Sequence, residues 1–218
     1  MIIPFSPEDL FELNTQLSPQ FNNGVIIIDN IFKNYEKILE VCNNLSVEQW
    51  KHTPTSRNFK DYYDCRPIFA NHHPNTEKVN YRKSIIFSLV KHYYNIDYEL
   101  NFQSHFTFNY FKHLNKNVSK NYQHHPHYDM DFNVIFYIDP FENGGTAIYE
   151  NIKLNNNEHE NLLIDISSFN IKHIIKSKPN RCVIFPGYNL HGGYIENHNT
   201  YYYNWRINIA NFLSKSND

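Results

Sequence analysis

The residues best suited to chemistry lie in a cluster of histidines and aspartates between Gln123 and Asp131, just before an apolar stretch. In an extended strand, alternate side chains point to the same side, so His127 and Asp129 project next to each other. A histidine and a carboxylate placed in this way are two of the three ligands in the triad of two histidines and one carboxylate that holds non-haem Fe(II). The sequence therefore predicts a metal site that needs one more histidine.

The third ligand that we predict is His191. It stands in a glycine-rich turn that follows a predicted strand over residues 181–186. His191 comes 191 − 129 = 62 residues after the carboxylate. That length of chain allows several strands to go around a barrel and return to the metal.

A candidate anion-binding residue lies in the last predicted strand, over residues 201–213. The alternation places Arg206 on the same face as Asn204 and Asn208, while aromatic and aliphatic side chains take the other face. A guanidinium on the inner face of a barrel needs an anion. The far carboxylate of a dicarboxylate would supply one through a bidentate contact.

Apolar periodicity divides the chain into an N-terminal elaboration, residues 1–100, and a β core, residues 101–214, which together form one structural domain. The first part predicts helices at 6–17, 34–45 and 75–94 and strands at 25–29 and 67–69. The second part predicts strands at 102–112, 128–138, 146–150, 171–176, 181–186 and 201–213, with polar loops at 114–123 and 151–161. These elements predict a mainly β protein with flanking helices.

The composition indicates in which compartment the protein works and which kinds of partner it does not bind. With 218 residues and a hydrophobic content of 41%, the chain is long enough for one sizeable core. A formal net charge of −2 and scattered lysines do not give the basic stripe of a nucleic-acid-binding protein. The three cysteines lack metal-ligand spacing, which predicts reduced thiols. No signal peptide or membrane-length apolar run is found, so we predict a cytoplasmic protein that binds neither nucleic acid nor membrane.

Taken together, these motifs resemble those of the Fe(II)- and 2-oxoglutarate-dependent oxygenases, and among them the prolyl 4-hydroxylase-like group. The resemblance covers roughly the C-terminal half of the chain. Arg206 lies 206 − 191 = 15 residues after the distal histidine, an interval on the long side for the cosubstrate-binding basic residue of this group. The matching segments are 106–110, 127–129, 133–137, 144–149 and 179–191.

The resemblance implies a double-stranded β-helix, a jelly-roll barrel of the cupin type. It also implies the cofactor Fe(II), the cosubstrates 2-oxoglutarate and O2, and hydroxylation of an unactivated C–H bond with succinate and CO2 as co-products. Asp129 occupies the position that related halogenases leave open for chloride, which favours hydroxylation. The implied metal ligands are His127, Asp129 and His191, and the implied 2-oxoglutarate contacts are Arg206 and Tyr137 at the C5 carboxylate, with Tyr110 and Asn208 nearby.

Two other hypotheses remain open from the sequence. A cupin-type metal site would use His125, His127, Asp131 and His191, and would leave Asp129 and Arg206 without roles. A binding module would keep the barrel and do no chemistry. On the oxygenase hypothesis, His124, His125 and Asp131 flank the site, and the neutral charge favours a peptide or small-molecule substrate.

Overall fold

The computed structural model describes residues 11–44, 62–65, 77–102, 107–113, 115–150 and 163–216. For residues 62–65, 77–79 and 107–110 it describes the backbone alone. The start of the predicted first helix, the predicted strand at 67–69 and the predicted loop at 151–161 lie outside the described residues. Among the helices that are described, none is long and apolar enough to cross a membrane.

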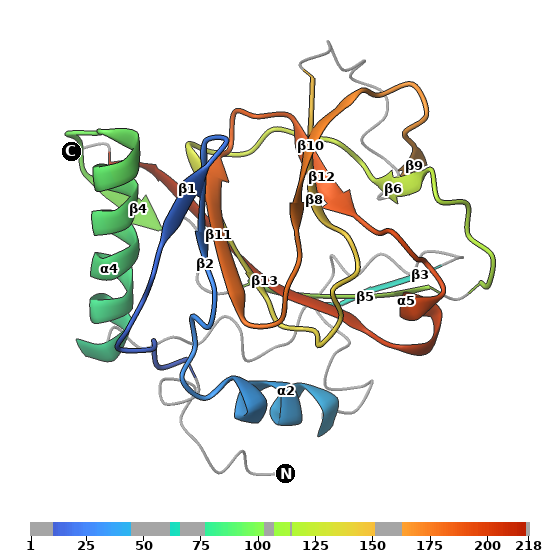
Figure 1. The fold of residues 1–218 in the computed structure, drawn as a ribbon, viewed down its shortest axis with the longest axis horizontal. Coiled ribbons are helices and arrows are strands. Elements are labelled where there is room, and N and C mark those ends of the chain that lie inside the picture. The colour runs from blue at the N-terminus through green and yellow to red at the C-terminus, as the bar shows by residue number, and fades with distance from the viewer. Residues whose placement is uncertain are drawn as a thin grey trace.

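Two antiparallel sheets form the body of the molecule (Figure 1). The larger has the order β1 (Gln20–Asn22), β2 (Val25–Ile28), β11 (Arg181–Pro186), β7 (Phe132–Tyr137), β13 (Arg206–Lys215), β5 (Thr107–His113) and β3 (Tyr62–Cys65), with β4 (Leu100–Phe102) also on β13. The smaller has the order β10 (Ile171–Lys176), β8 (Gly145–Tyr149) and β12 (His191–Tyr194). A separate pair joins β6 (Tyr122–His124) to β9 (Leu163–Asp165).

Strand β7 shows why the central strands are apolar on both faces. Its residues Val134 and Phe136 belong to a core cluster shared with the helices. The alternate residues Ile135 and Tyr137 belong to a second cluster, which includes Ile148 and Ile175 of the smaller sheet. The larger sheet is therefore covered on both faces, by helices on one and by the smaller sheet on the other.

Two helices cover the outer face of the larger sheet. Helix α2 (Tyr35–Asn44) contributes Ile38 and Cys42 to the outer core, and helix α4 (Glu77–Tyr94) contributes Ile86 and Val90. At the end of α4, the Tyr94 hydroxyl donates to the carbonyl oxygens of Gly24 at 2.8 Å and Ile184 at 3.0 Å. In Figure 1, α4 stands beside β1 and β4, away from β8, β10 and β12.

This arrangement confirms the predicted fold class, because the chain passes repeatedly between two facing antiparallel sheets. Strands β10 and β11 have the predicted bounds, and α2 and α4 lie within one or two residues of theirs. Strands β1 and β2 come from the first hundred residues and lie in the same sheet as β11. The N-terminal part therefore shares the larger sheet with the C-terminal part.

Some predicted elements are wrong. The predicted strand at 201–213 begins instead with helix α5 (Thr200–Tyr203), where the Asn204 N–H donates to the Thr200 carbonyl at 3.0 Å, and β13 starts only at Arg206. Of the predicted strand at 102–112, Phe102 lies in β4 and residues 107–112 lie in β5, with the residues between them outside the described part of the chain. Residues 11–17 are not helical, since Leu13 forms a β-bridge with Phe32. In each case local turns or pairing with distant strands overrode the periodic pattern.

Candidate metal centre

Three potential metal ligands meet at the end of the smaller sheet. His127, Asp129 and His191 each offer one ligand atom, and these atoms lie within 4.8 Å of one another. The Oδ2 of Asp129 is 3.1 Å from Nε2 of His191 and 3.5 Å from Nε2 of His127. The two histidine backbones are joined by reciprocal N–H to carbonyl hydrogen bonds of 2.8 and 3.0 Å. A β-bridge therefore fixes the spacing of residues that are far apart in the sequence.

The two histidine rings are oriented in the same way. The Nδ1 of His127 lies 2.8 Å from the carbonyl oxygen of His125, and the Nδ1 of His191 lies 2.8 Å from that of Asn189. Because a carbonyl oxygen only accepts, each Nδ1 carries a proton and donates it. Each Nε2 therefore points toward Asp129, which is the usual orientation of a metal-binding histidine held by an outer hydrogen bond.

Electrostatics couple the carboxylate to the rings. Burial alone would raise the pKa of Asp129, but hydrogen bonds from His127 and His191 hold it well below its usual range. Burial alone would lower the pKa of His127, but the Asp129 carboxylate raises it. The pKa of Asp129 is therefore low enough for its carboxylate to be ionised near neutral pH.

Asn133 adds a second polar group at the same point. Its Nδ2 lies 3.0 Å from Nε2 of His191, the atom that also faces Asp129. One nitrogen cannot both accept a hydrogen bond from the amide and donate one to the carboxylate. A cation bound to the Nε2 lone pair and to Asp129 would remove this conflict. The donor set therefore fits a divalent metal.

A pocket of about 240 Å³ connects these residues to Arg206. Arg206 is 6% exposed, and in the described part of the chain its guanidinium makes one hydrogen bond, to the Gly145 carbonyl at 2.8 Å, and no ion pair. A Cβ on Gly193 would lie 2.6 Å from Nη1 of Arg206, so a larger residue would displace the guanidinium. The apolar part of the wall consists of Phe111, Ile135, Ala210 and Phe212.

Of the other predicted cosubstrate residues, Asn208 and Tyr137 lie at or next to this pocket. Asn208 lines it. The hydroxyl of Tyr137 is 2.8 Å from Oγ1 of Thr146, which also lines it, and burial raises the pKa of Tyr137 to about 12. Tyr110 lies in β5 opposite Ile207, and its side chain is outside the described residues.

The cupin-type set is not brought together. The Oδ2 of Asp131 accepts a hydrogen bond of 2.7 Å from the Lys215 backbone N–H, and Asp131 does not line the pocket. His125 contacts the three-residue cluster through its backbone carbonyl oxygen, which accepts the hydrogen bond from Nδ1 of His127. His124 lines the pocket, where burial first and the charge of Arg206 second lower its pKa. In the described residues, the one group of three potential ligands contains Asp129 and not Asp131.

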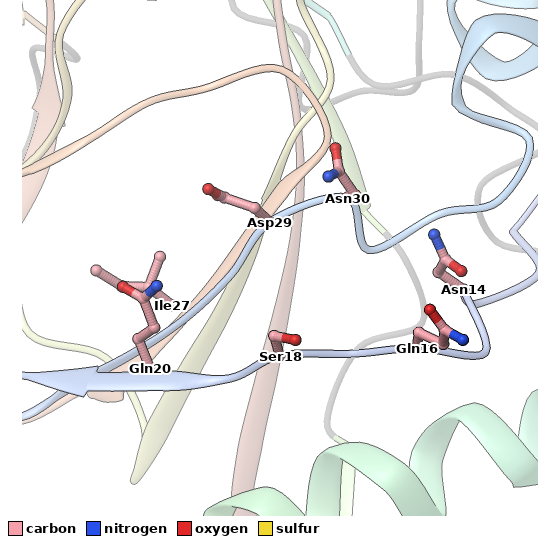
Figure 2. A pocket seen from close by; sticks show the side chains of 7 residues that line it. All are labelled: Asn14, Gln16, Ser18, Gln20, Ile27, Asp29 and Asn30. Carbon is pink, nitrogen blue, oxygen red and sulfur yellow. The ribbon is translucent and has the colours of Figure 1, made fainter.

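A larger pocket, of about 350 Å³, lies elsewhere, beside strand β2 (Figure 2). Among the described residues that line it, the one carboxylate is that of Asp29, whose pKa is lowered by hydrogen bonds from Arg181 at 2.6 Å and Lys178 at 3.0 Å. None of these lining residues is a histidine or a cysteine. Size alone therefore does not identify the site, and the reactive groups lie in the smaller pocket. The lining residues are Asn14, Gln16, Ser18, Gln20, Ile27, Asp29 and Asn30.

Sequence reasoning did not single out Asn133, Thr146 or Gly193 as site residues. Asn133 lies on the same face of its strand as Ile135 and Tyr137. The alternation of side chains along the strand was therefore the one sequence signal that placed it in the pocket. Thr146 and Gly193 lie in strands of the smaller sheet, and no periodic pattern relates them to Arg206. Only the register between β8 and β12, in which Gly193 pairs with Thr146, brings them together.

No family model and no curated protein matches the chain. Among solved structures, the epimerase SnoN in complex with Fe3+, alpha ketoglutarate and nogalamycin RO matches with a TM-score of 0.51, 10% identity, and coverage of 88% of this chain and 79% of SnoN. HygX from Streptomyces hygroscopicus, with nickel, 2-oxoglutarate and hygromycin B bound, matches with a TM-score of 0.50, 12% identity, and coverage of 89% and 84%.

A prolyl hydroxylase from Trichoplax adhaerens, in complex with a peptide fragment of hypoxia inducible factor, matches less well. Its TM-score is 0.47 at 15% identity, with coverage of 89% of this chain and 84% of that one. At these identities the likeness to SnoN and HygX is one of fold. The chain has the double-stranded β-helix fold of the iron- and 2-oxoglutarate-dependent oxygenases, as its sequence motifs predicted.

Proposed function

We propose that this protein is an Fe(II)- and 2-oxoglutarate-dependent dioxygenase that hydroxylates an unactivated C–H bond of a peptide side chain or a small molecule. The observation that carries the proposal is a single pocket with two different ends. One end holds His127, Asp129 and His191, and the other holds a buried guanidinium that has no ion pair among the described residues. SnoN and HygX, which were solved with a metal and 2-oxoglutarate, support the same assignment.

The metal end fits Fe(II) by its chemistry. Two imidazole Nε2 atoms and one carboxylate oxygen form the triad that non-haem iron uses, and three coordination positions stay available to other ligands. The outer hydrogen bonds from each Nδ1 hold both rings in the tautomer that binds metal. His127, Asp129 and His191 are thus the proposed protein ligands.

The other end fits the C5 carboxylate of 2-oxoglutarate. The Arg206 guanidinium has five N–H donors, of which the Gly145 carbonyl accepts one. A carboxylate bound by the remaining donors would offset the cost of burying the positive charge. Thr146, which lines the pocket, and Tyr137, bonded to it, add hydroxyl groups nearby. Asn208 and Tyr110 are proposed as further contacts.

When bound, iron with 2-oxoglutarate and O2 supplies the oxidation, in which the cosubstrate becomes succinate and CO2 and one oxygen atom enters a substrate C–H bond. The protein holds the cosubstrate at both ends. Ile135, Ala210 and Phe212 line the same pocket and offer water no side-chain hydrogen bond there. The residues therefore position and shield the reaction, and the oxidising power comes from the cofactor.

Exposed apolar side chains next to the metal end favour a peptide or small organic substrate. Tyr128 and Met130 flank Asp129 in the chain and are 45% and 48% exposed. Tyr188, at 68% exposed, follows Gly187, whose carbonyl accepts a hydrogen bond of 2.9 Å from the Asp129 N–H. Contiguous exposed apolar patches mark ligand-binding surfaces, and we propose that these three side chains form such a patch.

The test is the conversion of 2-oxoglutarate to succinate by the purified protein with Fe(II) and ascorbate in air. We expect succinate to form, slowly if the substrate is absent, and to require both iron and O2. The Asp129→Ala variant is the matched negative control. If calorimetry shows that the folded, metal-loaded protein does not bind 2-oxoglutarate, the proposal is wrong.

A further inference from the structure

Asn133 is a carboxamide in an apolar part of the larger sheet. It is 1% exposed and pairs with Phe185 of β11 and Phe212 of β13. Burying an amide at such a position costs free energy unless its donors and its acceptor find partners. Its Nδ2 contacts Nε2 of His191 at 3.0 Å, whereas its buried Oδ1 has no hydrogen-bond partner among the described residues. Packing alone does not explain a polar side chain here.

The contact with His191 uses the lone pair that a metal would take. The Nδ1 of His191 donates to the Asn189 carbonyl, so in the neutral ring Nε2 is the acceptor and the Asn133 amide donates to it. A cation bound at Nε2 would remove this acceptor. The amide N–H groups would then face the coordination sphere of the metal.

In that state the acceptors near the amide would be the Asp129 carboxylate, which also contacts Nε2 of His191, and the oxygen atoms of a bound 2-oxoglutarate. The side chain of Asn133 lines the pocket together with Asp129 and His191, and the neighbouring Ile135 offers no polar group. Building on the proposed function, we propose that Asn133 donates a hydrogen bond to the metal-chelating carboxylate of 2-oxoglutarate. Asn133 and Arg206 would then hold the two carboxylates of the cosubstrate separately.

The Asn133 amide would thus have two successive hydrogen-bond partners. Without metal it donates to the Nε2 lone pair of His191, and with metal and cosubstrate it would orient the metal-chelating carboxylate of 2-oxoglutarate. Because a hydrogen bond to a charged group is typically worth about 1.5 to 3 kcal/mol, loss of the amide should weaken 2-oxoglutarate binding by roughly 10-fold or more. Affinity for the metal alone should stay the same or rise, since a competitor for the lone pair is removed.

The experiment compares wild type, Asn133→Leu, Asn133→Ala and Asn133→Asp without turnover. Mn(II) affinity is measured first, followed by 2-oxoglutarate affinity of the Mn(II)-loaded protein by calorimetry, with folding checked by circular dichroism. Asn211→Leu is the matched control, because Asn211 is also 1% exposed and lies on the neighbouring strand β13. It stands between the pocket residues Ala210 and Phe212, so its side chain points to the face of the sheet opposite the pocket. We expect Leu and Ala at position 133 to weaken 2-oxoglutarate about 10-fold, and Asp more, because it places negative charge beside the carboxylate.

Binding of pyruvate tests the two ends of the cosubstrate site separately, because pyruvate has the chelating 2-oxo acid group and no distal carboxylate. Asn133→Leu should weaken pyruvate and 2-oxoglutarate by the same factor, while Arg206→Gln should affect 2-oxoglutarate alone. Unchanged 2-oxoglutarate affinity in folded Asn133→Leu and Asn133→Ala would overturn the assignment while leaving the proposed function intact. Weaker Mn(II) binding in both would instead make Asn133 a metal ligand. If wild type binds no 2-oxoglutarate, the proposed function itself fails.

Discussion

Among the described residues, two pairs of histidines lie in contact, and their surroundings give them different chemistry. The rings of His127 and His191 have centroids 4.6 Å apart, and those of His113 and His198 have centroids 4.7 Å apart. In the first pair each Nδ1 is bonded to a backbone carbonyl, so both Nε2 atoms face Asp129. In the second pair Nε2 of His113 and Nδ1 of His198 are bonded to each other at 2.6 Å.

The difference lies in the neighbouring groups and not in the ring spacing. Asp129 raises the pKa of His127 against the effect of burial. No carboxylate of the described residues acts on the second pair in this way, and burial lowers the pKa of both His113 and His198 to about 4. A carboxylate beside free Nε2 atoms provides the donor set of the proposed metal site, whereas mutual hydrogen bonding makes a neutral structural pair.

The largest expected effect comes from removing the carboxylate that distinguishes the pairs. Asp129→Ala loses one ligand and the negative charge of the site, so we expect metal affinity to fall by more than about 100-fold and succinate formation to stop. A titration with Mn(II) measures the first effect. The double variant His113→Gln/His198→Gln is the control and should bind Mn(II) as wild type does. Wild-type affinity in Asp129→Ala would show that the metal is held elsewhere.

Arg206 borders both pairs, and its charge contributes to the low pKa of His198. If its main partner is the C5 carboxylate, Arg206→Gln should raise the apparent constant for 2-oxoglutarate by roughly 10- to 150-fold, since it removes a charged hydrogen-bonded contact. Arg206→Lys should lose less, because it keeps the charge without the planar fork. A 2-oxoglutarate titration with iron occupancy checked in each variant measures this. Equal constants in all three proteins would make Arg206 structural.

Acid should destabilise the second pair. Burial lowers the pKa of His113 and His198 from 6.5 to about 4, so the fold favours the neutral rings. Their contribution to stability is therefore present above pH 6.5 and is lost as the pH falls toward 4, with a cost on the order of 2 to 3 kcal/mol. Urea unfolding of the metal-free protein at several pH values measures it.

The control for this pH dependence is again His113→Gln/His198→Gln. Its free energy of unfolding should fall less between pH 6.5 and 4 than that of wild type. Other buried groups with shifted pKa values, among them His124 and Asp139, remain in both proteins and supply the residual slope. The same pH dependence in both proteins would contradict the neutral structural pair.

The smallest expected effect belongs to the aspartate that faces away. Asp131→Ala removes a hydrogen bond to the Lys215 N–H and should cost about 1 kcal/mol of unfolding free energy, with Mn(II) affinity unchanged. Thermal unfolding and a Mn(II) titration check both expectations. A large loss of metal affinity would favour the cupin-type set with His125 and Asp131.

The sequence by itself determined the fold class and the candidate ligands. Alternation along residues 132–137 decided which residues face the smaller sheet and which face the helices, because successive side chains of a strand point to opposite sides. The same parity put His127 and Asp129 side by side. A polar residue on an inward face, Arg206, indicated an anion site for the same reason.

Only the tertiary structure decided which polar groups contact one another. Asp131 has the same parity as Asp129, yet it bonds to the Lys215 backbone because the chain enters β7 only at Phe132. Asn133 reaches His191 through a contact between residues 58 apart in sequence, and Gly193 makes room for Arg206 from another sheet. Such contacts depend on how the two sheets pack against each other, and the distance between residues of different sheets cannot be predicted from the periodicity of one strand.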